Sequence, residues 1–149
     1  AKGSAHLTNV QETAIFMRQL VDDVRRASDF SKMPENQNDP SAKFDILEEN
    51  QAGGVATSPI IYELAPGGRG IVRKSMPRPE AGSNFVNHIY CRDLFIMNCE
   101  FRHVNLAEGG KGIYITLKTG TPPNGSEEFE IKRFILCRNH ASNTALLRW

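Results

Sequence analysis

Apolar side chains recur with a helical spacing near the start of the chain. From position 7 to position 27 they return every three or four residues, which places them on one stripe of an α-helix. The stripe consists of Leu7, Val10, Ala14, Met17, Val21 and Val24. Thr8 or Asn9 can cap the first turn through a side-chain oxygen. The pattern predicts a long amphipathic helix over residues 7–29.

The opposite side of this predicted helix is polar, with one exception. Arg18 and Arg26 each lie four positions from Asp22, which is the spacing of ion pairs on a helix surface. Ile15 projects onto this polar side, and Phe16 lies at the edge of the apolar stripe. Two interpretations of Ile15 stay open. It is either a single exposed apolar residue or part of a second contact surface that faces another subunit.

After the helix, the pattern changes to the alternation that is typical of strands. Residues 31–43 contain two prolines and several Asn and Asp residues, and they predict a connecting loop. The predicted strands, all within a β-rich region at 44–149, are residues 44–48, 55–64, 70–75, 85–104 (one strand or two), 112–118 and 127–138. Residues 1–149 therefore predict a single α+β domain, in which a long N-terminal amphipathic helix packs on an antiparallel β-sheet.

The composition narrows the class of protein. The chain has 149 residues, the size of one domain, and 40% of them are hydrophobic, which suffices for a folded core. Its 18 basic and 17 acidic residues give a net charge of +1, so we expect no nucleic-acid partner. No apolar run approaches the roughly 20 residues that a membrane-spanning helix needs.

Cysteine and histidine provide the best candidate chemistry. They occur three or four positions apart in three places: His88 with Cys91, Cys99 with His103, and Cys137 with His140. Zinc favours these ligands, but residues three apart on a strand point to opposite faces, so only Cys99 and His103 would share a side. The glycine clusters near positions 67 and 110 fit turns rather than phosphate loops. We therefore expect no metal, no cofactor and no catalytic residue.

The three cysteines allow at most one disulfide within the chain. A bridge between Cys91 and Cys99 is disfavoured if both lie on one straight strand, because eight residues span roughly 26 Å. Cys99 and Cys137 form the better pair, and such a bridge would imply an oxidising compartment. The alternative is that all three are buried thiols.

Several strings along the chain resemble those of one protein family. They are residues 12–27, residues 60–64 and 70–74 around the Gly67-Gly68 turn, residues 99–104, and residues 129–139. In this order they are similar to the minor pseudopilins of bacterial type II secretion, above all the J-type subunit, and to the related minor pilins of type IV pili. The resemblance covers residues 10–139.

This resemblance implies a pilin-like fold and a role in assembly. Members of the family are structural subunits that cap or initiate a fibre of the cell envelope, and they catalyse no reaction. The family's helix exposes the side away from its own sheet to other minor pilins or pseudopilins. Ile15, Phe16, Arg18 and Asp22 would then form the subunit interface.

The resemblance also implies a location. The family has a basic leader and an apolar N-terminal half-helix that this sequence does not contain. Such a segment would anchor the full-length protein in the inner membrane before it enters the fibre. We therefore expect the protein in the periplasm or cell envelope.

Two other functions stay open at this point. A helix on a curved sheet could enclose a small ligand, as in a periplasmic or extracellular ligand-binding module. The Cys and His pairs could instead serve a small enzyme.

Overall fold

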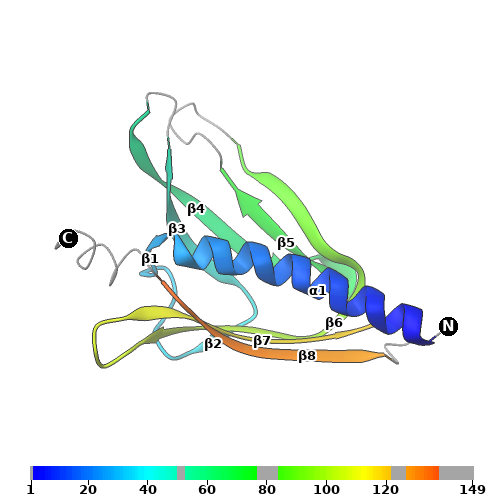
Figure 1. Ribbon diagram of the computed structural model, residues 1–149. Helices are drawn as coiled ribbons and strands as arrows, with labels where there is room; N and C mark the ends of the chain where they lie inside the picture. Colours follow the sequence, from blue (N-terminus) through cyan, green and yellow to red (C-terminus); the bar gives the residue numbers. More distant parts are fainter. Residues whose placement is uncertain (1, 50–52, 77–83, 122–126, 138–149) are drawn as a thin grey trace.

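The computed structural model of the protein describes residues 2–49, 53–76, 84–121 and 127–137, with side chains from residue 7 onward. Within these ranges the chain forms one α-helix, α1 (Lys2–Arg25), and eight strands (Figure 1). The strands are β1 (Ala27–Asp29), β2 (Asn38–Asp39), β3 (Ala42–Glu49), β4 (Val55–Leu64), β5 (Arg69–Ser75), β6 (Val86–Asn105), β7 (Lys111–Gly120) and β8 (Glu128–Leu136). A short 3-10 turn, η1 (Pro66–Gly68), joins β4 to β5.

These strands belong to one antiparallel sheet that curls into a half-barrel. Hydrogen-bonded neighbours follow the order β1-β3-β4-β5-β6-β7-β8, and β2 pairs with β6 beside this path. Most neighbours in the sheet are therefore also consecutive in the chain, as in hairpins joined end to end. Figure 1 shows two wings of the sheet: an upper wing of β3, β4 and β5, and a lower wing of β7 and β8.

The long strand β6 connects the two wings because it changes partners along its length. Its first part pairs with β5 and its second part with β7. The register with β5 shifts between Ile71, opposite Tyr90, and Arg69, opposite Phe95, which leaves a bulge around Cys91. Cys91 has a positive φ of 53°. Bulges bend a strand and increase its twist, so this one turns β6 from the upper wing into the lower wing.

A glycine on β5 lies opposite this bulge. Gly70 has a φ of 83°, which an ordinary side chain rarely tolerates. A Cβ atom at this position would also lie 2.9 Å from Cγ2 of Ile89 and 3.0 Å from the carbonyl oxygen of Tyr90. The bend of β6 therefore depends on the absence of a side chain on its neighbour.

Helix α1 lies on the concave side of the sheet, between the two wings (Figure 1). The space between the helix and the sheet is filled with side chains. The largest fully buried ones include Tyr62, Phe16, Phe30, Phe44, Phe101 and Leu20. The ring of Phe16 packs edge-on against Tyr62, with 5.8 Å between the ring centroids. The concave side is therefore a packed core.

The predicted α+β class, a long helix packed on a sheet in the manner of pilins, is wrong. Strands make up 60% of the structure and helix 19%, and the sheet is a curled half-barrel. The physical reason is the bend in β6, which folds the sheet around α1. Helical periodicity shows that a helix has a buried side, but it does not show whether the covering sheet is flat or curled.

The predicted positions of the main strands agree with the structure to within about two residues. The stretch at 85–104 forms a single strand, β6. Two boundaries differ. The helix starts at Lys2 and ends at Arg25, because Ala27–Asp29 forms strand β1 against β3 instead of a last helical turn. The predicted loop at 31–43 contains the two-residue strand β2 and the first residues of β3.

Candidate functional site

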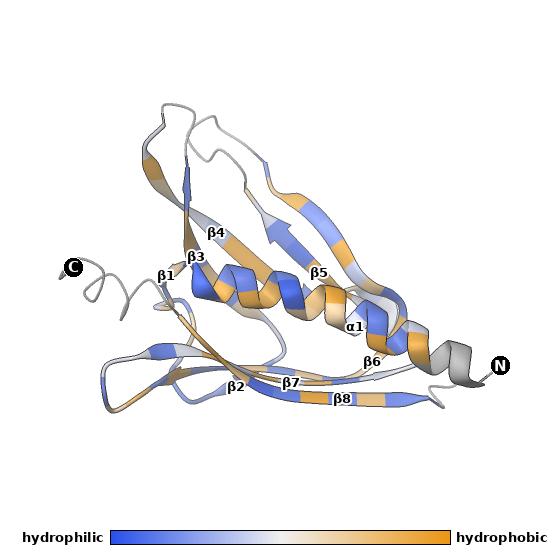
Figure 2. Ribbon diagram, in the orientation of Figure 1, coloured by the Kyte–Doolittle hydropathy of each residue, from blue (hydrophilic) through white to orange (hydrophobic). Residues whose placement is uncertain are grey.

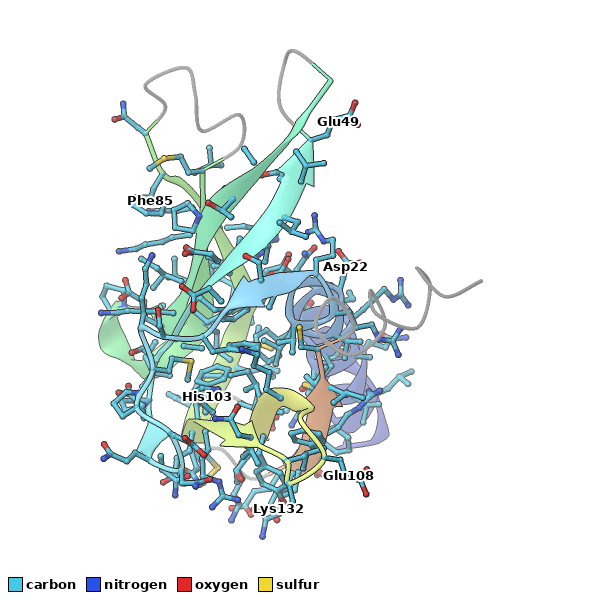
Figure 3. All side chains as sticks on the ribbon, turned by 90° about the vertical axis from the view of Figure 1, so that its left-hand side faces the viewer. Asp22, Glu49, Phe85, His103, Glu108 and Lys132 are labelled. Atoms are coloured by element: carbon cyan, nitrogen blue, oxygen red, sulfur yellow. The ribbon has the colours of Figure 1, made fainter. Side chains whose placement is uncertain are left out.

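Helix α1 has one side turned to the sheet and one side turned to solvent. The buried side consists of Asn9, Thr13, Phe16, Met17, Leu20, Asp23 and Val24. The exposed side consists of Leu7, Thr8, Gln11, Ala14, Ile15, Arg18, Asp22 and Arg25, and we call it the outward flank. Figure 3 views the molecule roughly along the helix and shows Asp22 pointing away from the sheet. The outward flank is the side of the described part of α1 that the protein's own sheet leaves uncovered.

This division differs from the predicted apolar stripe. Leu7 and Ala14 belong to the stripe but are exposed, whereas Asn9 and Asp23 lie outside it and are fully buried. Figure 2 shows polar and apolar residues alternating along α1. Polar side chains can be buried here because the sheet offers them hydrogen-bond partners. Two such anchors fix the rotation of the helix against the sheet.

The first anchor is Asp23, in the last turns of α1. Its carboxylate accepts hydrogen bonds from Nε and Nη2 of Arg73, at 2.7 and 2.9 Å, and from the hydroxyl of Tyr62 at 2.5 Å. Tyr62 on β4 lies opposite Arg73 on β5 in the register, so both side chains reach the same carboxylate. Gln19 and Arg26 donate further hydrogen bonds to it. Burial, together with the charge of Asp23, raises the pKa of Tyr62, so its hydroxyl stays a donor.

The second anchor is Asn9, in the N-terminal half of α1. Its side-chain amide donates to the carbonyl oxygen of Glu127 at 2.8 Å, and its oxygen accepts from the hydroxyl of Thr119 at 2.5 Å. Thr119 lies on β7, and Glu127 directly precedes β8. Asn9 therefore ties the helix to the lower wing, whereas Asp23 ties it to the upper wing.

Three of the four predicted interface residues lie on the outward flank. Ile15 is 52% exposed, and Arg18 and Asp22 are exposed as well. Phe16 is the exception, since it is fully buried in the core and presents no surface to a partner. Its inclusion in the interface is corrected for that reason: Phe16, at the edge of the predicted stripe, belongs to the buried side of the helix.

Two grooves run beside the outward flank. The first lies between α1 and β8, and we call it the α1–β8 groove. It has a volume of about 500 Å³ and is lined by Ala14, Met17, Arg18, Val21, Asp22, Arg25, Ile131 and Arg133. The second has a volume of about 360 Å³ and is lined by Ile15, Arg18, Gln19, Asp22 and Tyr90. Grooves next to exposed apolar side chains are typical of surfaces that meet other molecules.

The predicted disulfide between Cys99 and Cys137 does not form. All three cysteines lie in the described part of the chain, and each is a buried thiol. In the sheet, Cys99 is opposite Leu117, which is opposite Ile131, six positions from Cys137. One strand and several residues thus separate the two sulfur atoms, which is more than a disulfide spans. The alternative of three buried thiols is confirmed.

Two of the buried thiols donate hydrogen bonds to backbone carbonyl groups. Cys137 donates to the carbonyl oxygen of Ala27 at 2.9 Å, and Cys91 donates to that of Glu12 at 3.6 Å. Burial raises the pKa of Cys91 and of Cys99 to about 12. At neutral pH both side chains are therefore neutral and poor nucleophiles.

The histidines do not build a metal centre with these thiols within the ranges that the structure describes. Cys99 and His103 are both buried on β6, but the His103 ring packs on Phe30 and its Nδ1 lies 3.2 Å from the carbonyl oxygen of Met33. Figure 3 shows His103 inside the molecule. No group of three or more metal-binding side chains occurs among the described residues. His140, the predicted companion of Cys137, lies outside them.

Comparison with known proteins gives no family assignment. The chain matches no protein-family model, and no curated protein and no solved structure is similar enough to count as a match. In the described part of the chain, no helix is both long and apolar enough to span a membrane.

Eight of the eleven residues that line the two grooves were not predicted as site residues, and three of the eight show why. Arg25 lies three positions after Asp22 on the same side of the helix, so the helical spacing could have predicted that it belongs to the outward flank. Tyr90 and Arg133 come from β6 and β8. They reach α1 only because the sheet curls around it, and no local pattern in the sequence indicates this approach.

Proposed function

We propose that the protein is a structural subunit of a fibre in the cell envelope, a minor pseudopilin or minor pilin that assembles with sister subunits through the outward flank of α1. The observation that carries this proposal is the division of the helix into two sides. One side is fixed to the protein's own sheet by Asn9 and Asp23. The other exposes Leu7 and Ile15, each by more than half. A subunit of a helical fibre needs both sides, because its helix must hold its own domain and contact its neighbours.

The half-barrel is compatible with this role. The sheet covers only one side of α1, and the two grooves run beside the other. In Figure 1 the N-terminal end of α1 also projects beyond the strands. A sister subunit placed along the outward flank would bury Leu7 and Ile15 and so recover the free energy of removing apolar surface from water.

Two features favour assembly over the other functions that the sequence left open. The concave side of the sheet is filled by side chains such as Phe16, Leu20 and Tyr62, and a small ligand would have to displace them. The thiols of Cys91 and Cys99 are buried and protonated, which disfavours an enzyme that uses them as nucleophiles.

The substitution Ile15→Asp tests the proposal. The full-length variant is returned to a strain that lacks the gene, and fibre-dependent secretion or the number of pili is measured. We expect assembly to fall by roughly tenfold or more, because a charge would enter a subunit contact. The isolated domain should keep its melting temperature, since the side chain lies outside the core.

Val55→Asp is the matched control for this experiment. Val55 is 69% exposed at the start of β4, away from α1, so the same new charge at that site should leave assembly unchanged. Normal assembly of the Ile15→Asp variant would count against the proposal, as would a gene deletion that leaves the fibre intact.

A further inference from the structure

The α1–β8 groove combines an apolar base with a basic rim. Its more buried lining residues are apolar: Met17 is buried, and Val21 and Ile131 are partly buried. Its exposed lining residues include three arginines, Arg18, Arg25 and Arg133. These arginines come from two different elements, α1 and β8, and they surround the same apolar base.

The three guanidinium groups of this rim have no carboxylate partner among the described residues, where the ion pairs involve other cations. The one carboxylate that lines the groove, Asp22, is already paired with Arg26 at 3.3 Å. Like charges gathered beside an apolar surface create a local positive potential. A partner that brings carboxylates to the rim and apolar side chains to the base would satisfy both properties of the groove.

The groove also has the length of a short helix. Its lining on α1 runs from Ala14 to Arg25, which is about 16 Å along the axis, or three helical turns. On β8, Ile131 and Arg133 are two positions apart and therefore point to the same face, towards α1. The small side chain of Ala14 allows the close approach of a second helix. Apolar residues at i, i+4 and i+7 of such a helix would cover the apolar base.

We infer that the α1–β8 groove docks an amphipathic helix of a sister subunit, in which glutamate or aspartate residues flank an apolar stripe. This inference rests on the proposed function, because it names the segment that the outward flank receives from its neighbour. Charge-assisted hydrogen bonds from Arg18, Arg25 and Arg133 orient the helix, while its apolar stripe displaces water from the base of the groove. The same arginines repel a basic helix, which makes the site selective.

Three synthetic peptides of about 16 residues, roughly four helical turns, are the probes for this site. The first has a leucine stripe flanked by glutamates, the second has the same stripe flanked by lysines, and the third has the glutamate composition in scrambled order. Binding to the purified protein is measured by fluorescence anisotropy and located by NMR chemical-shift changes. We expect only the first peptide to bind, with the largest shifts at Ala14, Val21 and Ile131.

Charge reversal tests the rim directly. The combined variant Arg18→Glu, Arg25→Glu, Arg133→Glu should bind the glutamate peptide roughly tenfold or more weakly and should gain binding of the lysine peptide. Arg133→Glu alone is compared with Lys132→Glu, which makes the same change of charge at the adjacent position. Lys132 is exposed at the outer surface in Figure 3, on the face of β8 opposite to Arg133, so its reversal should leave binding unchanged.

Several results would overturn this inference: no binding of the glutamate peptide, equal binding of the scrambled peptide, or binding that survives charge reversal. The inference would also be overturned if the protein dimerised in analytical ultracentrifugation and the triple variant did not. In that case a second copy of this chain, and not a different subunit, would occupy the groove. If the peptide binds but gene deletion leaves the fibre intact, the proposed function is wrong and the inferred docking of a helix in the groove is still supported. If gene deletion abolishes the fibre but the peptide does not bind, only the inference about the groove is wrong.

Discussion

The two sides of α1 differ in a way that hydrophobicity alone does not explain. The buried side contains the carboxylate of Asp23 and the amide of Asn9, each hydrogen-bonded to the sheet. The outward flank contains Leu7 and Ile15, which are largely exposed. For these four residues, burial of apolar area alone would favour the opposite arrangement, although the same buried side also contains Phe16, Met17, Leu20 and Val24. The polar anchors therefore determine how the helix is rotated, and this rotation leaves the apolar side chains of Leu7 and Ile15 uncovered.

The sharpest test of this comparison places the same charge on adjacent residues of the two sides. Phe16→Asp should cost more than about 5 kcal/mol of the free energy of unfolding, because a charge enters the packed core and a large ring is lost. Ile15→Asp should change this free energy by less than about 0.5 kcal/mol, since its side chain is exposed. Urea denaturation followed by circular dichroism measures both. Similar losses in the two variants would contradict a two-sided helix.

A second test compares two neighbouring carboxylates. Asp23→Ala should destabilise the protein by about 3–5 kcal/mol, because the buried Tyr62 and the Arg73 side chain, which is only 15% exposed, would both lose their acceptor. Asp22 has a side chain that is 63% exposed and pairs with Arg26 at the surface. Asp22→Ala should therefore cost less than about 1 kcal/mol. The same urea titration applies, and a loss in Asp22→Ala as large as that in Asp23→Ala would argue against the anchor.

The buried thiols predict how stability depends on pH. In the unfolded chain a cysteine ionises near 9.0, but Cys91 and Cys99 keep their protons in the folded state up to about pH 12. The unfolded state therefore binds fewer protons between these values, and stability falls as the pH rises. Together the two thiols should cost about 2–3 kcal/mol between pH 8 and pH 10.

Urea denaturation at a series of pH values checks this expectation, with the double variant Cys91→Ala, Cys99→Ala as the control. The variant is less stable at neutral pH, but its stability should fall much less steeply above pH 9. A variant that follows the wild-type profile would show that other groups cause the loss.

The smallest expected effect concerns the second anchor. Thr119→Val removes the hydroxyl that donates to Asn9 and should cost about 1–2 kcal/mol, because the buried amide oxygen keeps only the longer hydrogen bond from Thr13, at 3.4 Å. Thr116→Val is the control on the same strand, three positions away and on the opposite face. It should change the free energy of unfolding by less than about 0.5 kcal/mol. If the Thr119→Val variant is as stable as the control, the hydrogen bond between Thr119 and Asn9 does not hold the helix on the sheet.

Local patterns predicted the strands well, because antiparallel hairpins are built from neighbouring residues whose side chains alternate between two faces. The rotation of α1 could not be predicted in the same way. The partners of Asp23 and Asn9 include Tyr62 and Thr119, which are 39 and 110 positions away. No periodicity within the helix contains that information, and so Phe16 was assigned to the wrong side.

The curl of the sheet depends on Gly70 and Cys91, which in the sequence look like ordinary turn and strand residues. Gly70 comes two positions after the Pro66-Gly67-Gly68 turn and resembles its continuation, and Cys91 lies inside the stretch that is predicted as strand at 85–104. Their positive φ values bring Tyr90 and Arg133 to the helix only when the whole sheet is assembled. Ile15, Arg18 and Asp22 could be predicted as exposed because their spacing is a property of the helix itself.

The placement of the two anchors also has a mechanical consequence. Asn9 and Asp23 are 14 positions apart, about 21 Å along the axis, and they attach α1 to different wings of the sheet. A pull on the N-terminal end of α1 would therefore strain both wings in shear instead of peeling away one strand. Because β6 belongs to both wings, the tension would be shared across the whole domain.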